Sequence, residues 1–276
     1  MIYSHAMNAA SPRRRALPAA LAIAVILALA AVVLGVWRPW TTASSTAQVA
    51  VAGAGHDDAV AIAPAPLVLP EHPTVLVFGD SWTYGSAASV PTLGYAYVLA
   101  GLIDGTTVVN GVRGSGYLKP GLDGPAFGER IAALDPTLAP DLVIIQGSIN
   151  DREQGEAGYR EAVKAAWDAM AATYPDAQIV ILGPAPHLLP IGAGTARIDA
   201  DLSALSAERG WWYISPIREN WITQANYLDV IDVDFGRRHP STEGHRYLAE
   251  RLAADLEELR AAPVTVAGGS ESTSNQ

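Results

Sequence analysis

The tripeptide Gly79-Asp80-Ser81 is the first feature of the chain whose residue types and spacing suggest chemistry. It follows an apolar run at residues 74–78, where a strand would turn into a helix. A serine hydroxyl at such a turn is a poor nucleophile until a neighbouring imidazole takes its proton. The chain contains no cysteine, which excludes thiol nucleophiles, cysteine-ligated metals and disulfides. Ser81 therefore needs a histidine from elsewhere in the chain.

Three further polar loops occur at residues 110–117 (NGVRGSGY), 147–151 (GSIND) and 239–245 (HPSTEGH). Each loop alone has an ordinary structural interpretation: Asn150-Asp151 as a helix cap and His239-Pro240 as a turn. Gly79-Asp80-Ser81 by itself is also typical of a capping turn. The glycine-rich loop lacks the GxGxxG spacing of a phosphate cradle, and the acidic charge of the chain disfavours a nucleotide.

Taken together and in chain order, the four loops resemble the sequence blocks of the SGNH (GDSL-like) hydrolase family, which supply Ser, Gly, Asn and His. The resemblance covers roughly residues 74–259. It implies that Ser81 is the nucleophile, that His239 is general base and then general acid, and that no metal or organic cofactor is required. It also implies an oxyanion hole, whose donors are the backbone N–H groups of Ser81 and Gly114 and the side-chain amide of Asn150.

One position departs from the family pattern, in which an acid commonly stands three residues before the histidine. Here that residue is Gly236. An extended chain at residues 230–235 would point Asp232 and Asp234 to one face. We predict that Asp234, the nearer one, orients His239, with Asp232 or a backbone carbonyl as the alternatives. The same Asp/His cluster lacks the ligand spacing of a metal site, so no metal is expected.

Two smaller features concern the same blocks. Residues 147–150 (GSIN) are one residue longer than the usual Gly-x-Asn-Asp block, although Asn150-Asp151 still matches it. His245 lies six residues after His239, about 240° round a helix, so the two cannot share a face. We expect His245 to pack or to form a supporting hydrogen bond.

The polar loops alternate with patterns that predict a layered α/β domain. Continuous apolar runs are typical of strands buried on both faces, and they lie at residues 74–78, 106–110, 141–146, 178–182 and 211–214. Helical patterns occupy residues 92–103, 127–134, 156–174, 195–208 and 241–260, the last beginning with a capping box at Ser241. This alternation predicts a flavodoxin-like three-layer α/β/α domain at residues 73–262 with a parallel five-stranded sheet. Ligands bind such sheets at the carboxyl ends of the strands, where the polar loops stand.

The N-terminal region predicts export and a membrane anchor. Three arginines precede an uncharged apolar stretch long enough to span a bilayer, so residues 1–15 are expected in the cytoplasm and residues 16–37 in the membrane. A cleaved signal peptide is the alternative. Residues 38–72, rich in Ala, Thr, Ser, Gly and Pro, predict a flexible linker, and residues 263–276 a disordered tail. Either way, the catalytic domain is expected outside the cytoplasm.

The size and charge of the chain restrict its partners. Its 276 residues suffice for one large domain, and its 18 basic against 28 acidic residues give a net charge of −10. Residues 1–40 hold four arginines and no acid, so the remainder is more acidic still. This balance argues against nucleic acid or anionic lipid as the main partner of the globular part.

These observations predict a membrane-tethered extracytoplasmic serine esterase that hydrolyses acyl esters, either carbohydrate O-acyl or lipid esters. A catalytically silent envelope module that binds glycan or protein is one alternative, and an acyltransferase to sugar hydroxyls is another. The presence of Ser81, Asn150 and His239 disfavours the silent module. Plausible walls of the substrate pocket are Trp82, Tyr84, Tyr117 and residues 183–187, but the sequence does not specify the acyl chain or the leaving group.

Overall fold

The computed structural model describes residues 64–236 and 238–261. The predicted cytoplasmic segment, membrane helix and C-terminal tail, and the predicted linker up to residue 63, lie outside these residues. Among the helices that the structure does describe, none combines the length and the apolar character needed to cross a membrane.

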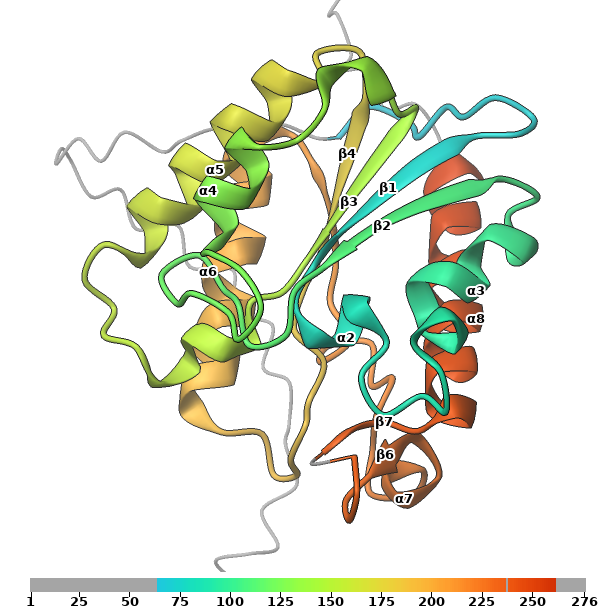
Figure 1. The fold of residues 1–276 in the computed structure, drawn as a ribbon, viewed down its shortest axis with the longest axis vertical. Helices are drawn as coiled ribbons and strands as arrows, with labels where there is room; N and C mark the ends of the chain where they lie inside the picture. The colour runs from blue at the N-terminus through green and yellow to red at the C-terminus, as the bar shows by residue number, and fades with distance from the viewer. Residues whose placement is uncertain (1–63, 237, 262–276) are drawn as a thin grey trace, which may run out of the picture. The chain divides into compact units, whose positions relative to one another are not determined.

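A five-stranded parallel sheet forms the centre of the domain (Figure 1). Its strands are β1 (Thr74–Gly79), β2 (Thr106–Gly111), β3 (Leu142–Gln146), β4 (Gln178–Leu182) and β5 (Trp212–Ile214). They are arranged in the order β2-β1-β3-β4-β5, and every neighbouring pair is parallel. This is the strand order of flavodoxin-like doubly wound folds. The predicted sheet is confirmed, with each strand end within one residue of its expected position.

Helices cover both faces of the sheet (Figure 1). One layer consists of α3 (Tyr95–Leu102) and α8 (Thr242–Ala261), and the other of α4 (Phe127–Ala132), α5 (Tyr159–Thr173) and α6 (Ala193–Arg209). The sequence patterns did not predict the short elements α2 (Ser81–Tyr84), α7 (Tyr227–Val230), β6 (Ile231–Asp232) and β7 (His239–Pro240). The last two strands form a separate antiparallel pair.

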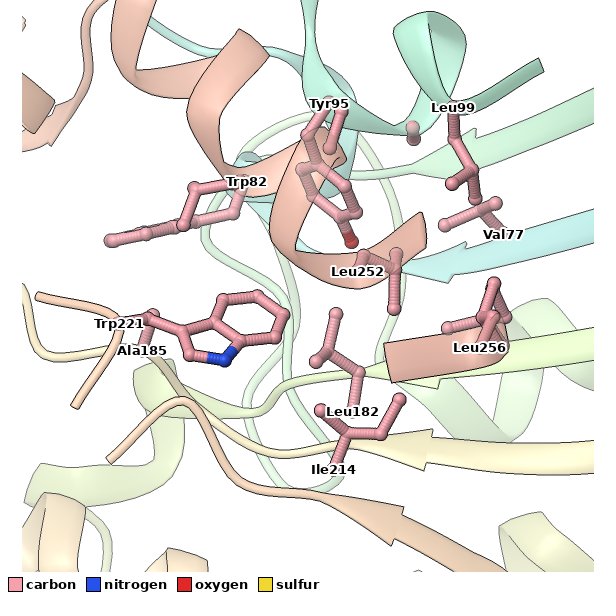
Figure 2. Close-up of a cluster of buried hydrophobic side chains, with 14 of the residues drawn as sticks. Val77, Trp82, Tyr95, Leu99, Leu182, Ala185, Ile214, Trp221, Leu252 and Leu256 are labelled. Atoms are coloured by element: carbon pink, nitrogen blue, oxygen red, sulfur yellow. The ribbon is translucent and has the colours of Figure 1, made fainter. Parts of the chain in front are cut away.

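Alternate residues of each central strand enter different halves of the core. Val75 and Val77 of β1 pack with side chains from α3 and α8, whereas Leu76 and Phe78 pack with side chains from α4, α5 and α6. Figure 2 shows the first half, in which Leu252 and Leu256 of α8 face the strands. Burying such a side chain contributes roughly 1.5–3 kcal/mol. Burial on both faces explains why the strands are apolar at consecutive positions.

Helix α8 begins where the capping box predicts. The Ser241 hydroxyl accepts a hydrogen bond from the Gly244 N–H at 3.0 Å. One turn later, His245 is fully buried and joins α8 to the loop after α2. Its Nδ1 accepts from the Tyr95 N–H at 3.2 Å, and its Nε2 faces the Ser86 carbonyl at 3.0 Å. Burial lowers the pKa of His245 to about 4, so the expected supporting hydrogen bonds are made by a neutral ring.

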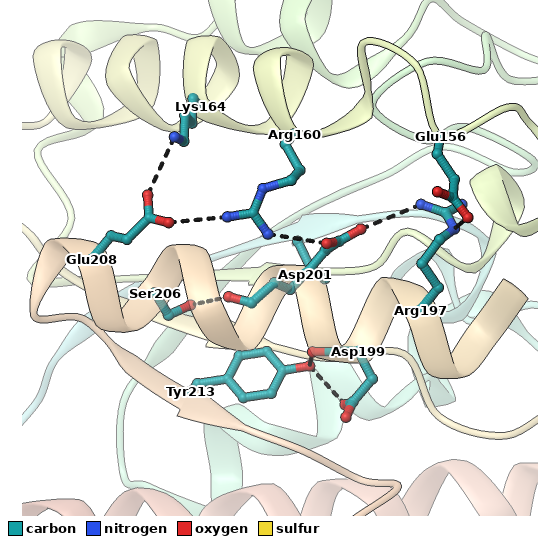
Figure 3. Close-up of polar contacts among 10 residues, drawn as sticks. Glu156, Arg160, Lys164, Arg197, Asp199, Asp201, Ser206, Glu208 and Tyr213 are labelled. Carbon is teal, nitrogen blue, oxygen red and sulfur yellow. Dashed lines mark hydrogen bonds and ion pairs between the residues drawn. The ribbon is translucent and has the colours of Figure 1, made fainter. Parts of the chain in front are cut away.

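Ion pairs connect α5 to α6 on the surface of the domain (Figure 3). The Arg160 guanidinium bridges Asp201 at 3.0 Å and Glu208 at 2.9 Å, and Lys164 also reaches Glu208. Exposed pairs of this kind contribute at most about 1 kcal/mol each. The network therefore supports the contact between the two helices without determining it.

Candidate active site

The carboxyl ends of three neighbouring strands bring the predicted site residues together. Ser81 follows β1, Gly114 follows β2 and Asn150 follows β3, while His239 begins β7. Figure 1 shows α2 and β7 near this same end of the sheet. All four residues line one cleft of about 520 Å³. The fifth predicted residue, Asp234, does not line it.

The serine is positioned by a tight turn between β1 and α2. Ser81 is the first residue of α2, and the Asp80 carboxylate caps this helix by accepting from the Trp82 N–H at 2.9 Å. A Cβ at Gly79 would overlap the side chains of Thr83 and Gln146, so the turn leaves no space for a larger residue. The result is a serine fixed at the edge of the sheet, with its Oγ atom 2.9 Å from His239 Nε2.

The protonation of His239 follows from its two contacts. Its Nδ1 lies 2.7 Å from the Gly236 carbonyl oxygen, which can only accept a hydrogen bond. The ring proton therefore sits on Nδ1, and the lone pair of Nε2 faces the Ser81 hydroxyl. Burial lowers the pKa of His239 below its ordinary value, and the contact with Gly236 opposes that shift. The ring is thus neutral at pH 7 and oriented to take a proton from Ser81.

The structure does not bring Asp234 to His239, contrary to the prediction. Asp234 is exposed; its backbone N–H donates to the Asp232 carboxylate at 3.0 Å, and its own carboxylate makes no hydrogen bond to the described residues. The turn is closed by Arg238 N–H, which donates to the Asp232 carbonyl at 2.9 Å, and this closure leaves the Gly236 carbonyl against the imidazole. The backbone-carbonyl alternative is the one that the structure shows.

The same turn explains why glycine stands where the family commonly has an acid. A Cβ at Gly236 would lie 2.6 Å from Asp232 Cβ and 2.7 Å from Ala87 Cβ. Real Cβ atoms do not approach other atoms this closely, so no side chain fits at position 236 in this backbone. The tight closure of the turn therefore explains both why no acid stands at position 236 and why the Gly236 carbonyl contacts His239.

Three candidate N–H donors belong to residues that line the cleft together, namely Ser81, Gly114 and Asn150. Within the described part of the chain, the backbone N–H groups of Ser81 and Gly114 donate to no other residue. Gly114 has φ of +77°, a left-handed conformation that glycine adopts without strain. The Asn150 amide donates to the Ser115 carbonyl at 3.0 Å and to the Asp80 carboxylate at a longer 3.4 Å. An oxyanion at this corner would replace the longer contact and complete a three-donor site.

A buried arginine that the sequence did not predict connects the ends of β1 and β2. Arg130 of α4 is only 6% exposed. Its guanidinium donates to the Gly79 carbonyl at 2.9 Å, the Ser115 hydroxyl at 2.8 Å, and the carbonyl and side-chain oxygens of Asn110 at 2.6 Å each. It also lies 4.2 Å from the ring centre of Phe78. Arg130 therefore positions the loops that carry two of the three candidate oxyanion donors.

The side chain of Asp80 connects the turn that carries Ser81 to Asn150. Its side chain is fully buried, and that burial raises its pKa to about 7, while Arg130 lowers it. Besides the cap of α2 and the contact with Asn150, the Gln146 amide can donate to it at 3.1 Å. The carboxyl group thus ties the ends of β1 and β3 together.

Asp151 fixes the loop after β2 from the side of β3. Its buried carboxylate accepts from three consecutive backbone N–H groups, Tyr117 at 2.7 Å, Leu118 at 3.2 Å and Lys119 at 3.0 Å. Burial raises the pKa of Asp151, and these hydrogen bonds oppose that shift. Asn150 therefore faces the cleft while its neighbour anchors the loop that contains Gly114.

Only one of the predicted pocket walls lines the cleft. Tyr84 does, whereas Trp82 and Tyr117 are buried in the two halves of the core, and no residue of the 183–187 loop reaches the cleft. The sequence analysis missed Arg113, Leu122 and Phe235, which do line it. Arg113 forms a paired contact with Asp123 on the rim.

A family model and a curated relative both match this chain to GDSL-type proteins. The family model described as the GDSL-like Lipase/Acylhydrolase family matches residues 77–247. A curated GDSL lipase of Mycobacterium tuberculosis is 28% identical over 143 residues, which make up 50% of this chain and 59% of the relative. The chain thus spans less than two thirds of the length of that relative.

Two solved structures share the fold at low sequence identity. A putative lipolytic protein of the G-D-S-L family from Desulfitobacterium hafniense has a TM-score of 0.54 at 17% identity, covering 66% of this chain and 99% of that one. A family two carbohydrate esterase from Clostridium thermocellum, solved in complex with cellohexaose, has a TM-score of 0.53 at 20% identity, covering 71% and 65%.

The buried arginine gives a testable prediction. Arg130→Met removes the hydrogen bonds to the ends of β1 and β2 and leaves Asp80 without a nearby cation. We expect the free energy of unfolding to fall by about 3 kcal/mol. We also expect the single-turnover rate at which p-nitrophenyl acetate acylates Ser81 to fall more than about tenfold in the folded variant, because the donors lose their positions. Urea unfolding and stopped-flow absorbance measure the two quantities.

Arg160→Met is the matched control, since it removes a partly exposed guanidinium from the α5–α6 surface. It should change stability by no more than about 1 kcal/mol and leave the acylation rate unaltered. An Arg130→Met variant that is acylated as fast as the parent would show that the guanidinium does not position the donors.

Proposed function

The chain belongs to the GDSL-like lipase/acylhydrolase family, and on that premise we propose that it is a serine esterase that hydrolyses acyl esters. The observation that carries the proposal is the 2.9 Å contact between Ser81 Oγ and His239 Nε2, in a cleft that also holds the three oxyanion donors. The same contact favours an enzyme over a silent binding module, because binding alone does not need an activated hydroxyl.

The geometry supports a two-step mechanism. His239 Nε2 takes the proton of Ser81 Oγ as that oxygen attacks the ester carbonyl carbon, and the carbonyl oxygen becomes an oxyanion held by Ser81, Gly114 and Asn150. His239 then gives the proton to the leaving alcohol, and an acyl-serine forms. A water molecule, deprotonated by His239, attacks the acyl-serine; the acid departs and Ser81 regains its proton.

The support for the two charges of the transition state is unequal. Each oxyanion donor contributes roughly 3–4 kcal/mol of transition-state stabilisation. The imidazolium that forms on His239 faces the neutral Gly236 carbonyl instead of a carboxylate. The oxyanion hole therefore supplies the larger share, which is consistent with the number of buried side chains that position it.

We propose carbohydrate O-acyl esters as the substrates, with lipid esters as the second class. The carbohydrate esterase with the same fold supports the first, and the mycobacterial GDSL lipase supports the second. Acyl transfer to a sugar hydroxyl would use the same acyl-serine with a different acceptor.

We also propose that residues 16–37 tether the domain outside the cytoplasmic membrane. The support comes from the sequence: the length of the uncharged stretch and the three arginines before it. The tether would place the cleft near envelope polysaccharides or exogenous lipids.

Replacement of the nucleophile tests the proposal directly. Ser81→Ala should abolish hydrolysis of p-nitrophenyl acetate with unchanged circular dichroism, because it removes one oxygen atom from a turn held by other contacts. A fluorophosphonate probe should label the parent at Ser81, as located by peptide mass spectrometry, and should not label the variant. Parental activity in a folded Ser81→Ala variant would refute the serine mechanism.

The carbonyl contact at His239 predicts the effect of the neighbouring acids. Asp234→Asn and Asp232→Asn should each change kcat by less than about tenfold, since neither carboxylate touches the imidazole. The active form has neutral His239, so kcat/KM should rise with pH through a pKa below the ordinary 6.5 and then level off. Rates between pH 5 and pH 9 test both points; a loss near 10⁴-fold in Asp234→Asn would instead indicate an Asp–His pair.

The tether has its own test. Full-length protein expressed in its host should sediment with membranes, and protease added from outside should cut within residues 38–72 and release the domain. A soluble mature form starting near residue 47 would show that the segment is a cleaved signal.

A further inference from the structure

The two sides of the cleft have different chemical roles in ester hydrolysis. The leaving alcohol must come within hydrogen-bond distance of His239 Nε2, which gives it a proton. The carbonyl oxygen must face the opposite corner, formed by Ser81, Gly114 and Asn150. The alcohol half of the substrate therefore contacts the residues around His239, and these include Phe235 and Gly236.

Phe235 differs from the other phenylalanines of the chain. The chain has three, and Phe78 and Phe127 are completely buried, whereas Phe235 is 96% exposed and lines the catalytic cleft. A single exposed apolar side chain is common on protein surfaces, so exposure alone does not indicate a site. Its position does, because the residue next to it holds the catalytic imidazole.

The turn that carries Phe235 is closed by its own hydrogen bonds. Asp232 accepts from the Asp234 N–H at 3.0 Å through its carboxylate and from the Arg238 N–H at 2.9 Å through its carbonyl. Gly236 also packs against Ala87, which lines the same side of the cleft. The backbone on both sides of Phe235 is therefore held by the same turn that orients His239, and the exposed ring projects from this turn into the cleft.

The other residues of this side suit a compact ring rather than a long chain. Ala87, Ala88 and Gly236 are small, and the cleft that they line is open to solvent in the part of the chain that the structure describes. The negative face of an exposed aromatic ring attracts the axial C–H groups of a pyranose chair, and the two rings cover apolar area on each other. A flexible alkyl chain would gain less, because it stays largely in water here.

From this arrangement we infer that Phe235 is the binding platform for the alcohol half of the substrate, and that it stacks on the pyranose ring of an acylated sugar. The inference rests on the proposed esterase function and narrows its substrate class to esters whose alcohol is a sugar. Lipid esters with a flexible alcohol become the alternative outcome of the test.

Leu122 provides a matched control within the same cleft. It is also large, apolar and 81% exposed, but it lies on the oxyanion side, where its Cγ would be 3.5 Å from a Cβ on Gly114. Truncation of Leu122 removes a similar apolar area without touching the side assigned to the alcohol.

The experiment compares Phe235→Ala, Phe235→Trp and Leu122→Ala on glucose pentaacetate and on ethyl acetate, which has the same acyl group and no ring. Phe235→Ala should raise KM for glucose pentaacetate by about 3- to 10-fold with kcat nearly unchanged, the range expected for one aromatic contact. It should leave kcat/KM for ethyl acetate within about twofold. Phe235→Trp should keep the parental ratio of kcat/KM for glucose pentaacetate to kcat/KM for ethyl acetate. Leu122→Ala should leave that ratio unaltered.

A second readout does not depend on catalysis. Saturation-transfer NMR with methyl β-glucoside should give a signal with the Ser81→Ala protein and lose it when Phe235→Ala is added. If Phe235→Ala leaves the ratio of the two kcat/KM values unchanged, including by lowering both equally, the inference is overturned while the esterase function stands. If the parent hydrolyses neither these esters nor p-nitrophenyl acetate but the glucoside signal depends on Phe235, the esterase proposal fails and the sugar platform remains.

Discussion

A buried guanidinium is the constraint on which the candidate site depends. The charge of Arg130 is removed from water, and oxygens at or just after the ends of β1 and β2 accept hydrogen bonds from both of its terminal nitrogens, while its Nε has no partner among the described residues. Its place is set by α4, which packs through Phe127 against Phe78 with ring centres 5.0 Å apart. The packing of an ordinary apolar core thus determines where the donors of the oxyanion hole stand.

His239, the candidate catalytic histidine, is held by a single turn. The turn between β6 and β7 closes so tightly that residue 236 has no space for a side chain, and its carbonyl replaces the carboxylate that commonly orients such a histidine. A neutral acceptor fixes the tautomer as well as a carboxylate does, but it stabilises the imidazolium less. The buried acids of this site do not orient the base. Asp80 contacts the Asn150 amide and Asp151 holds the loop after β2, so both position the candidate oxyanion donors.

The sequence predicts the sheet and most of the site because both depend on local patterns. Strands buried on both faces are continuous apolar runs, and Ser81, Asn150 and His239 stand in recognisable blocks next to them. Asp234 was misjudged because its distance from His239 depends on how a turn closes, which alternation along a strand does not reveal. Arg130 was missed because a charged residue on a helix normally faces water, and its partners lie 15 to 51 residues away in the chain. The membrane segment stays a prediction, since it lies outside the described residues.

The central claim is that the strand-end loops form a prebuilt oxyanion hole beside a Ser81–His239 pair held by a carbonyl. A crystal structure of the domain with Ser81 covalently phosphonylated tests it most directly. The account predicts a phosphonyl oxygen within about 2.7–3.1 Å of Ser81 N, Gly114 N and Asn150 Nδ2, with Asn150 released from Asp80 and His239 Nδ1 still on the Gly236 carbonyl. A phosphonyl oxygen that points into solvent, or an imidazole turned to Asp234, would contradict it.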